Sequence, residues 1–211
     1  MPNKVINVTE TDPIYSALVE KLTGATDDKL IIVARGFDNR KDDKIPPVAI
    51  KNGIFFYVAY DLGDALAFPP EYTTEQIYIA KANTARRARI VSAAEMFGSG
   101  YDSVDPTFPD GCPIDDYEYD GEPMIIVTLD AKSKGAGILL CSDCMKALKE
   151  KIGDFLIAPS SIHEIIITPA SAGTDILDLS AMVREINASP VVDPDDILGN
   201  RAYYAEEWID D

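Results

Sequence analysis

The pattern of apolar and polar residues in the first half of the chain predicts two buried strands and two helices. Nearly continuous apolar runs at 28–37 and 53–62 are typical of strands inside a sheet, and a charged, turn-rich stretch separates them. Apolar residues at a spacing of four predict an amphipathic helix over 11–24. A second helix is expected over 73–90, where a capping box opens the helix at Thr73 and three arginines near its end complement the helix dipole.

The second half of the chain alternates apolar and amphipathic segments more regularly. We expect two strands joined by the short connection KSK, then a helix, two more strands, another helix and a closing strand or extended tail. Because antiparallel strand pairs are interspersed with helices, the pattern predicts an α+β fold with a central mixed, largely antiparallel sheet and packed helices. The expected strands are 123–131, 135–141, 154–159, 163–169 and 201–208, the helices are 142–153 and 174–189, and the core stripe of the last helix is Ile176, Leu179, Val183 and Ile186.

The length of the chain suits a single domain over residues 1–211. Neither a repeat nor a clean linker divides it. A change in composition marks a possible subdivision into an N-terminal part at 1–98, an acidic loop at 99–123 and a C-terminal α+β part at 124–211. Strict alternation of strands and helices is absent, which argues against a doubly wound nucleotide-binding fold.

The composition is that of a protein with a hydrophobic core, because 46% of the residues are hydrophobic and 26% are charged. The longest apolar runs fall well short of the roughly 20 residues that a membrane-spanning helix requires. The first residues contain no apolar signal core, and three cysteines are too few for a disulfide framework. We therefore expect a cytoplasmic protein that does not enter a membrane.

The charge is strongly negative and unevenly distributed. The formal net charge is −17, and residues 106–211 carry 21 acidic side chains against 7 basic ones, whereas residues 1–105 carry 15 and 12. Such a surface repels nucleic-acid backbone, so we expect no direct nucleic-acid binding, and it attracts basic proteins. The charge thus indicates either a merely soluble acidic protein or one that binds a basic protein partner, including an inhibitor from a mobile element that imitates nucleic acid.

The stretch 100–123 concentrates this charge. It holds eight acidic residues, no basic ones, four prolines and four aromatic residues, which is the composition of a loop. Its acidic residues do not follow the spacing of a calcium-binding EF-hand. The stretch is either a solvated loop or a protein-binding surface, in which aromatic side chains anchor and charges steer. The residues expected to contact a partner are Tyr101, Phe108, Asp115, Asp116, Tyr117, Glu118, Tyr119 and Asp120.

The only histidine lies in the sequence APSSIHEIIITP at 158–169. On a strand over 162–168, His163 shares a face with two isoleucines while Glu164 faces the opposite way and cannot orient the imidazole. A serine nucleophile needs its hydroxyl within about 3 Å of the imidazole, which a regular strand does not allow. The favoured interpretation is a histidine that ties a turn to the core, and catalysis or metal binding are the alternatives. This structural motif comprises Pro159, Ser160, Ser161, His163 and Glu164.

The sequence CSDC places Cys141 and Cys144 between an apolar segment and a helix. A helix N-terminus lowers the pKa of a thiol, so a redox-active pair is one interpretation. Two small buried residues without chemistry are another. A zinc site is the third, since every cysteine and the sole histidine together complete a tetrahedral Cys₃His set. The zinc ligands under this hypothesis are Cys112, Cys141, Cys144 and His163.

Several phrases in the chain resemble a bacterial family described as domain of unknown function 5688. They are TTEQIYIAKANTARR and IVSAAEMFG in the first half, and KGAGILL, PSSIHEIIITP, LSAMVREIN and DPDDILGNRAYYAEE in the second. A more distant likeness in the order of elements links the chain to domain of unknown function 1444. The resemblance covers roughly 45–98 and 123–207. It implies a shared α+β fold and no particular activity.

Phosphate-binding loops, dinucleotide fingerprints and paired-histidine metalloprotease helices are absent from the sequence. We therefore expect a bacterial binding or regulatory protein without its own catalytic apparatus, and no cofactor. A zinc-binding or thiol-dependent protein is the alternative. The sequence does not indicate the oligomeric state.

Overall fold

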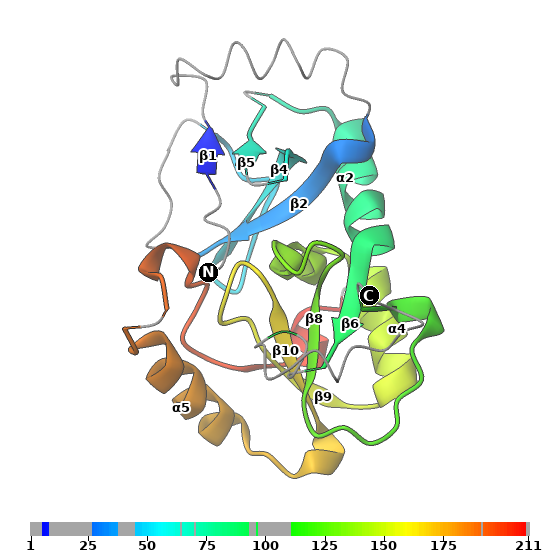
Figure 1. The fold of residues 1–211 in the computed structure, drawn as a ribbon, viewed down its shortest axis with the longest axis vertical. Helices are drawn as coiled ribbons and strands as arrows, with labels where there is room; N and C mark the ends of the chain where they lie inside the picture. The colour runs from blue at the N-terminus through cyan, green and yellow to red at the C-terminus, as the bar shows by residue number, and fades with distance from the viewer. Residues whose placement is uncertain are drawn as a thin grey trace.

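Two β-sheets lie one above the other along the long axis of the molecule, and helices pack against both (Figure 1). The expected helix at 11–24 and the aromatic residues Tyr101 and Phe108 lie outside the described residues. The computed structural model describes residues 6–8, 27–37, 45–63, 65–69, 71–92, 96, 111–190 and 192–209.

The first sheet is built on the two apolar runs of the first half of the chain. Strands β2 (Leu30–Arg35) and β4 (Ile54–Asp61) pair antiparallel along most of their length and are almost entirely buried. Alternate residues of β2 and β4 face two different hydrophobic clusters, which explains why the runs are apolar at nearly every position. The other strands are β1 (Ile6–Val8), which pairs parallel with β5 (Ala65–Ala67), and β3 (Ala49–Lys51), which pairs with β4.

The second sheet has six strands in the order β11-β9-β10-β8-β6-β7, and every pair in it is antiparallel. Its central strands β8 and β10 consist largely of isoleucine and valine that are buried. The strands are β6 (Ala88–Val91), β7 (Cys112–Pro113), β8 (Ile125–Leu129), β9 (Phe155–Ala158), β10 (Ile165–Pro169) and β11 (Tyr203–Tyr204). The division into subdomains stays a prediction, although β6 precedes residue 98 and belongs to this second sheet.

One large hydrophobic cluster joins the two sheets, because it contains Ile32 and Phe56 of the first and Ile125 and Ile157 of the second. The short 3-10 helix η5 (Gly135–Leu140) lies between them. The prediction of a strand at 135–141 is therefore wrong. β8 already has β10 on one side and β6 on the other, so no edge remains for a hairpin partner.

Glycines allow η5 to come this close to both sheets. A Cβ atom on Gly137 would lie 1.9 Å from the carbonyl oxygen of Ile32, and one on Gly135 would lie 2.3 Å from the Cα of Thr128. Neither distance is possible for a real side chain, so both positions require glycine. The apolar run 135–139, which contains both glycines, is buried because it fills the space between the sheets, not because it extends one of them.

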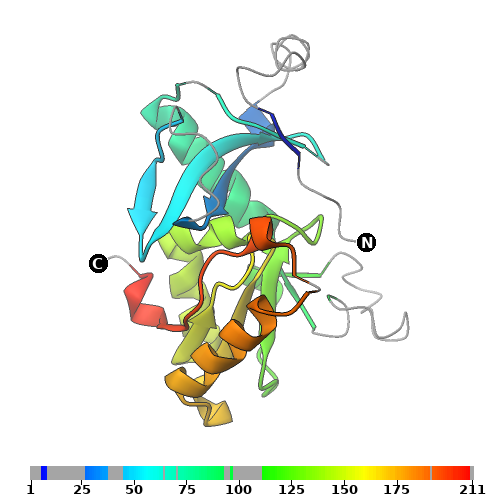
Figure 2. The same ribbon diagram turned by 90° about the vertical axis from the view of Figure 1, so that its left-hand side faces the viewer.

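Three α-helices complete the described fold (Figure 2). Helix α2 (Thr74–Arg87) begins at the expected capping box of Thr73 and ends earlier than predicted, because Ala88 adopts extended geometry and starts β6. Helices α4 (Ser142–Ile152) and α5 (Ile176–Asn187) pack on opposite faces of β9. In the expected stripe of α5, Leu179 and Val183 are buried, Ile176 is half-buried and Ile186 is exposed.

The α+β class and the largely antiparallel pairing are confirmed, with the strands divided between two sheets. The parallel pair of β1 and β5 makes the first sheet mixed. Among the helices that the structure describes, none has both the length and the apolar character needed to span a bilayer.

Candidate functional site

The segment PSSIHE forms a turn that holds a second loop by backbone hydrogen bonds. Ile162 donates from its backbone nitrogen to the carbonyl of Asp196 at 2.9 Å, and Leu198 donates to the carbonyl of Ser160 at 3.1 Å. Ser161 forms an isolated β-bridge with Ile197. Strand β10 begins only at Ile165, so the expected strand start at His163 is wrong. The turn fixes residues 196–198 against the second sheet.

The backbone of His163 links this turn to the core. Its carbonyl accepts hydrogen bonds from the hydroxyl of Thr128 and from the backbone nitrogen of Gly135, both at 2.8 Å. Its backbone nitrogen donates to Oγ of Ser161 at 3.0 Å. The serine hydroxyl thus serves the backbone of the turn, which is the role expected of serine in a tight turn.

The imidazole of His163 is mostly buried and lies against a carboxylate. Nε2 lies 3.3 Å from Oδ2 of Asp196, while Nδ1 is buried and has no hydrogen-bond partner among the described residues. Glu164 is also buried, and burial raises its pKa while the neighbouring charge of His163 lowers it. Because residues 161–164 precede β10, the strand alternation that was expected for His163 and Glu164 does not apply here. The carboxylate against the imidazole is that of Asp196, a residue the sequence did not single out.

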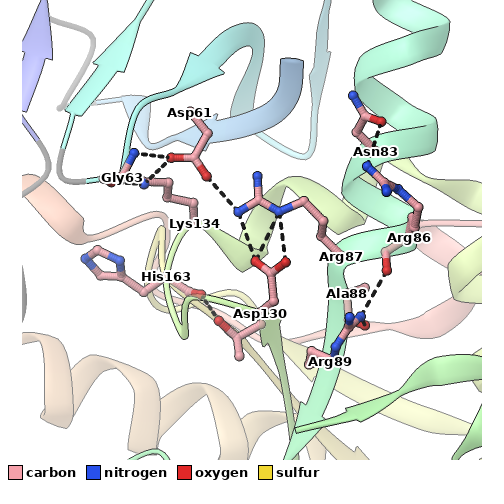
Figure 3. Close-up of polar contacts among 11 residues, drawn as sticks. Asp61, Gly63, Asn83, Arg86, Arg87, Ala88, Arg89, Asp130, Lys134 and His163 are labelled. Carbon is pink, nitrogen blue, oxygen red and sulfur yellow. Dashed lines mark hydrogen bonds and ion pairs between the residues drawn. The ribbon is translucent and has the colours of Figure 1, made fainter. Parts of the chain in front are cut away.

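A second polar cluster, which the sequence analysis missed, lies at the junction of the two sheets (Figure 3). Asp61, at the end of β4, lies between two cations: Lys134 Nζ is 2.6 Å from its Oδ1, and a terminal nitrogen of Arg87 is 2.7 Å from its Oδ2. Lys134 also donates to the carbonyl of Gly63. The remaining side of the Arg87 guanidinium forms a two-pronged contact with Asp130.

Most of this cluster is removed from water. The side chains of Lys134 and Asp61 are 3% and 6% exposed. Burial raises the pKa of Asp61, but the hydrogen bonds and charges of Lys134 and Arg87 outweigh burial, and the pKa lies below its ordinary value. All four charges are mutually satisfied, and His163 points its imidazole away from Arg87 and Asp130 (Figure 3). The arrangement therefore stabilises the junction and leaves no group free for acid–base chemistry.

The cysteine pair lies where the sequence predicts, at the start of α4. Cys141 precedes the helix, Cys144 lies in its first turn, and both thiols are free and buried. A hydrogen bond with Cys144 and burial raise the pKa of Cys141, and the same hydrogen bond lowers the pKa of Cys144. The lowered pKa favours a thiolate, but burial restricts the access of a second thiol or an oxidant.

The four expected zinc ligands are all described, and the structure does not bring them together. Within the described residues, which include Cys112 on β7 and His163 in the turn, no three His, Cys, Asp or Glu side chains are placed to hold a metal ion. The geometry gives the zinc hypothesis no support.

The acidic segment, which we define as residues 111–122, is attached firmly to the fold. Lys151 of α4 donates to the backbone carbonyls of Asp115 and Tyr117 at 2.8 and 3.1 Å. The rings of Tyr117 and Tyr119 are half-buried and pack against the hydrophobic core, so part of their apolar surface serves the fold. The segment exposes four carboxylates, which belong to Asp115, Asp116, Glu118 and Asp120.

These four carboxylates differ from the other acidic side chains described above. No lysine or arginine of the described ranges forms an ion pair with them. By contrast, Asp154 and Glu206 pair with Lys149. Four exposed carboxylates without a described cationic partner therefore lie together within residues 115–120.

Comparisons with known proteins add one finding. No curated protein and no solved structure matches the chain significantly. A family model described as "Family of unknown function (DUF5688)" matches residues 72–206, which include the PSSIHE turn, η5 and the acidic segment. Since this match covers more than half of the chain, the protein belongs to the DUF5688 family.

Proposed function

We propose that this protein is a binding protein that recognises a basic protein partner through the acidic segment. The observation that carries the proposal is the set of four exposed carboxylates without an ion-pair partner in the described residues. They lie on a backbone that Lys151 and two packed tyrosine rings already hold in place. A pre-ordered surface loses little conformational entropy on binding, so its charge is available for recognition.

The net charge of −17 supports the same conclusion at longer range. It accelerates the approach of a basic protein and repels nucleic acid. A nucleic-acid-binding protein is one kind of partner with the required charge, and for such a partner the acidic segment would occupy the surface that otherwise binds phosphates.

Two variants with equal net charge test the proposal. In the first, the carboxylates of the acidic segment are neutralised by Asp115→Asn, Asp116→Asn, Glu118→Gln and Asp120→Asn. In the control, four exposed carboxylates elsewhere are neutralised by Glu71→Gln, Glu75→Gln, Asp178→Asn and Glu185→Gln. Each immobilised protein is incubated with a bacterial extract, and the retained proteins are eluted with increasing salt.

We expect the wild type and the control to retain the same basic protein and to release it as salt rises, because salt screens exposed charges. The segment variant should retain much less of it. Equal losses in both variants would show that only overall charge matters and would refute recognition by this segment. Competition by duplex DNA for the retained protein would identify the partner as a nucleic-acid-binding protein.

A further inference from the structure

A pocket of about 600 Å³ opens between the first sheet and the C-terminal part of the chain. One wall consists of Gly36 and Phe37, which follow β2, together with the turn at Asn52 and Gly53 between β3 and β4. The opposite wall consists of residues from 194 to 203. The volume of the pocket is within the range of roughly 300–1,000 Å³ that is usual for small-molecule sites.

Contacts on all sides hold the walls in place. The hydroxyl of Tyr203 donates to the carbonyl of Asn52 at 3.0 Å and so links the two walls. Gly36 approaches the loop so closely that a Cβ atom on it would lie 2.5 Å from the carbonyl oxygen of Ile197. Behind the loop, the PSSIHE turn supplies the two backbone hydrogen bonds and the contact of His163 with Asp196. The pocket is thus formed before a ligand arrives.

The described part of the lining combines apolar surface with the guanidinium of Arg201. Phe37, which is 71% exposed, and half-buried Ile197 line the pocket, together with Leu198 and Tyr203, which are almost fully buried. The guanidinium of Arg201 lies over the ring of Tyr203, 4.0 Å from its centroid. Among the described residues that line the pocket there is no aspartate or glutamate, although the chain as a whole is strongly acidic. This charge distribution favours the binding of an anion in the pocket and disfavours anion binding at the acidic segment.

We propose that this pocket binds a small organic anion that has a flat apolar body. Phe37 and the aliphatic side chains of the loop contact the body of the ligand, and removal of Phe37 from water contributes to the affinity. Arg201 binds the carboxylate or phosphate of the ligand through charge-assisted hydrogen bonds, which a planar guanidinium forms well. Arg201 lies 3.6 Å from Glu207 at a site where its side chain is 56% exposed, so this ion pair is weak and readily exchanged for a ligand.

The site is independent of the proposed partner surface, because none of its lining residues belongs to the acidic segment. Failure of one proposal therefore leaves the other intact. The pocket also gives the PSSIHE turn a role beyond stability. His163 is a positioning residue for the pocket wall, since it holds Asp196 next to Ile197.

Nuclear magnetic resonance of the full-length ¹⁵N-labelled protein tests the proposal, with 2-naphthoate as the probe. The backbone amides of Gly36, Gly53 and Gly199 line the pocket and report on binding, whereas Gly121 and Gly173 serve as internal controls. We expect saturable shifts of the pocket glycines only. Neutral 2-naphthalenemethanol should bind about tenfold more weakly, because one charge-assisted hydrogen bond corresponds to roughly a factor of ten in affinity.

Matched variants separate the two parts of the site. Arg201→Gln should weaken 2-naphthoate about tenfold and leave the neutral alcohol unchanged, whereas Arg184→Gln on α5 should change neither. Phe37→Ala should weaken both probes, and Leu177→Ala, at a residue 74% exposed, should weaken neither. Spectra of each unliganded variant confirm folding. Equal affinity for the acid and the alcohol, or no saturable shift at millimolar probe, would overturn the proposal.

Discussion

Replacement of Lys134 by methionine tests whether the buried charge cluster holds the two sheets together. The substitution keeps most of the side-chain length and removes the ammonium group, which leaves Asp61 buried with Arg87 as its remaining cation. Loss of one partner from a buried ion pair costs about 3–5 kcal/mol, because the other charge is then left poorly compensated. Since Arg87 stays in place, we expect the lower end, about 3 kcal/mol.

Urea denaturation measures this loss, and Trp208 is a suitable fluorescent reporter because it is the only tryptophan and is fully buried. For a slope of about 2 kcal/mol per molar urea, the transition midpoint falls by roughly 1.5 M. Lys132→Met is the matched control, because Lys132 has the same left-handed backbone conformation two residues earlier and forms no ion pair with a carboxylate of the described residues. It should cost less than about 0.5 kcal/mol.

The same variant has a defined pH dependence. The pKa of Asp61 is lowered in the folded protein, so the stability contributed by its ionised form is present above the unfolded pKa of about 3.9. That contribution is lost as the pH falls through the lower folded pKa. The difference between wild type and Lys134→Met should therefore shrink below about pH 4. A loss no larger than that of Lys132→Met at pH 7 would refute the view that Lys134 compensates a buried charge.

Two further substitutions test the turn and the packing between the sheets. Burial raises the pKa of Glu164, so the folded state binds this proton more tightly than the unfolded state, and stability declines as the pH rises above about 4.3. Glu164→Gln should thus lose less stability than wild type between pH 4.5 and pH 7 in urea titrations, and parallel profiles would contradict this. Gly137→Ala should destabilise by at least about 3 kcal/mol, because its methyl group meets the backbone of Ile32, whereas Gly199→Ala, whose Cβ has only an ordinary contact at 3.9 Å, should be nearly neutral. Thermal unfolding of the two variants provides the comparison, and similar melting temperatures would show that η5 can move away from β2.

The periodicity of the sequence predicted correctly those elements whose burial or boundary can be read from their own residues. The apolar runs of β2 and β4 are buried on both faces, and the capping box at Thr73 does begin α2. The run at 135–140 was predicted wrongly because its apolar residues fit a strand and a buried 3-10 helix equally well. What decides between them is the pairing of β8 on both edges, which depends on strands distant in the chain.

The charge cluster was missed for a related reason. Lys134 and Asp61 are separated by 73 positions, and nothing in the local sequence links a lysine in a short connection to an aspartate at a strand end. The arginine at position 87 was explained by the helix dipole, whereas its guanidinium bridges two carboxylates. That the imidazole of His163 stabilises the turn stays a prediction from the sequence. Its contact with Asp196 depends on a loop more than thirty residues away, which local periodicity cannot reveal.

The family model matches only part of the proposed pocket. The matched residues 72–206 include Arg201, His163 and the loop that His163 positions, but they do not include Phe37 or the turn at Asn52. If an organic anion binds here, Arg201, which binds its charged group, and His163, which positions the pocket wall, both belong to the part of the chain that the family model matches. The aromatic surface that contacts the body of the ligand belongs to the preceding part. We therefore expect a member of the family that has an arginine at the position of Arg201 to bind anions here, and titration of such a member with 2-naphthoate and with aliphatic carboxylates tests this expectation.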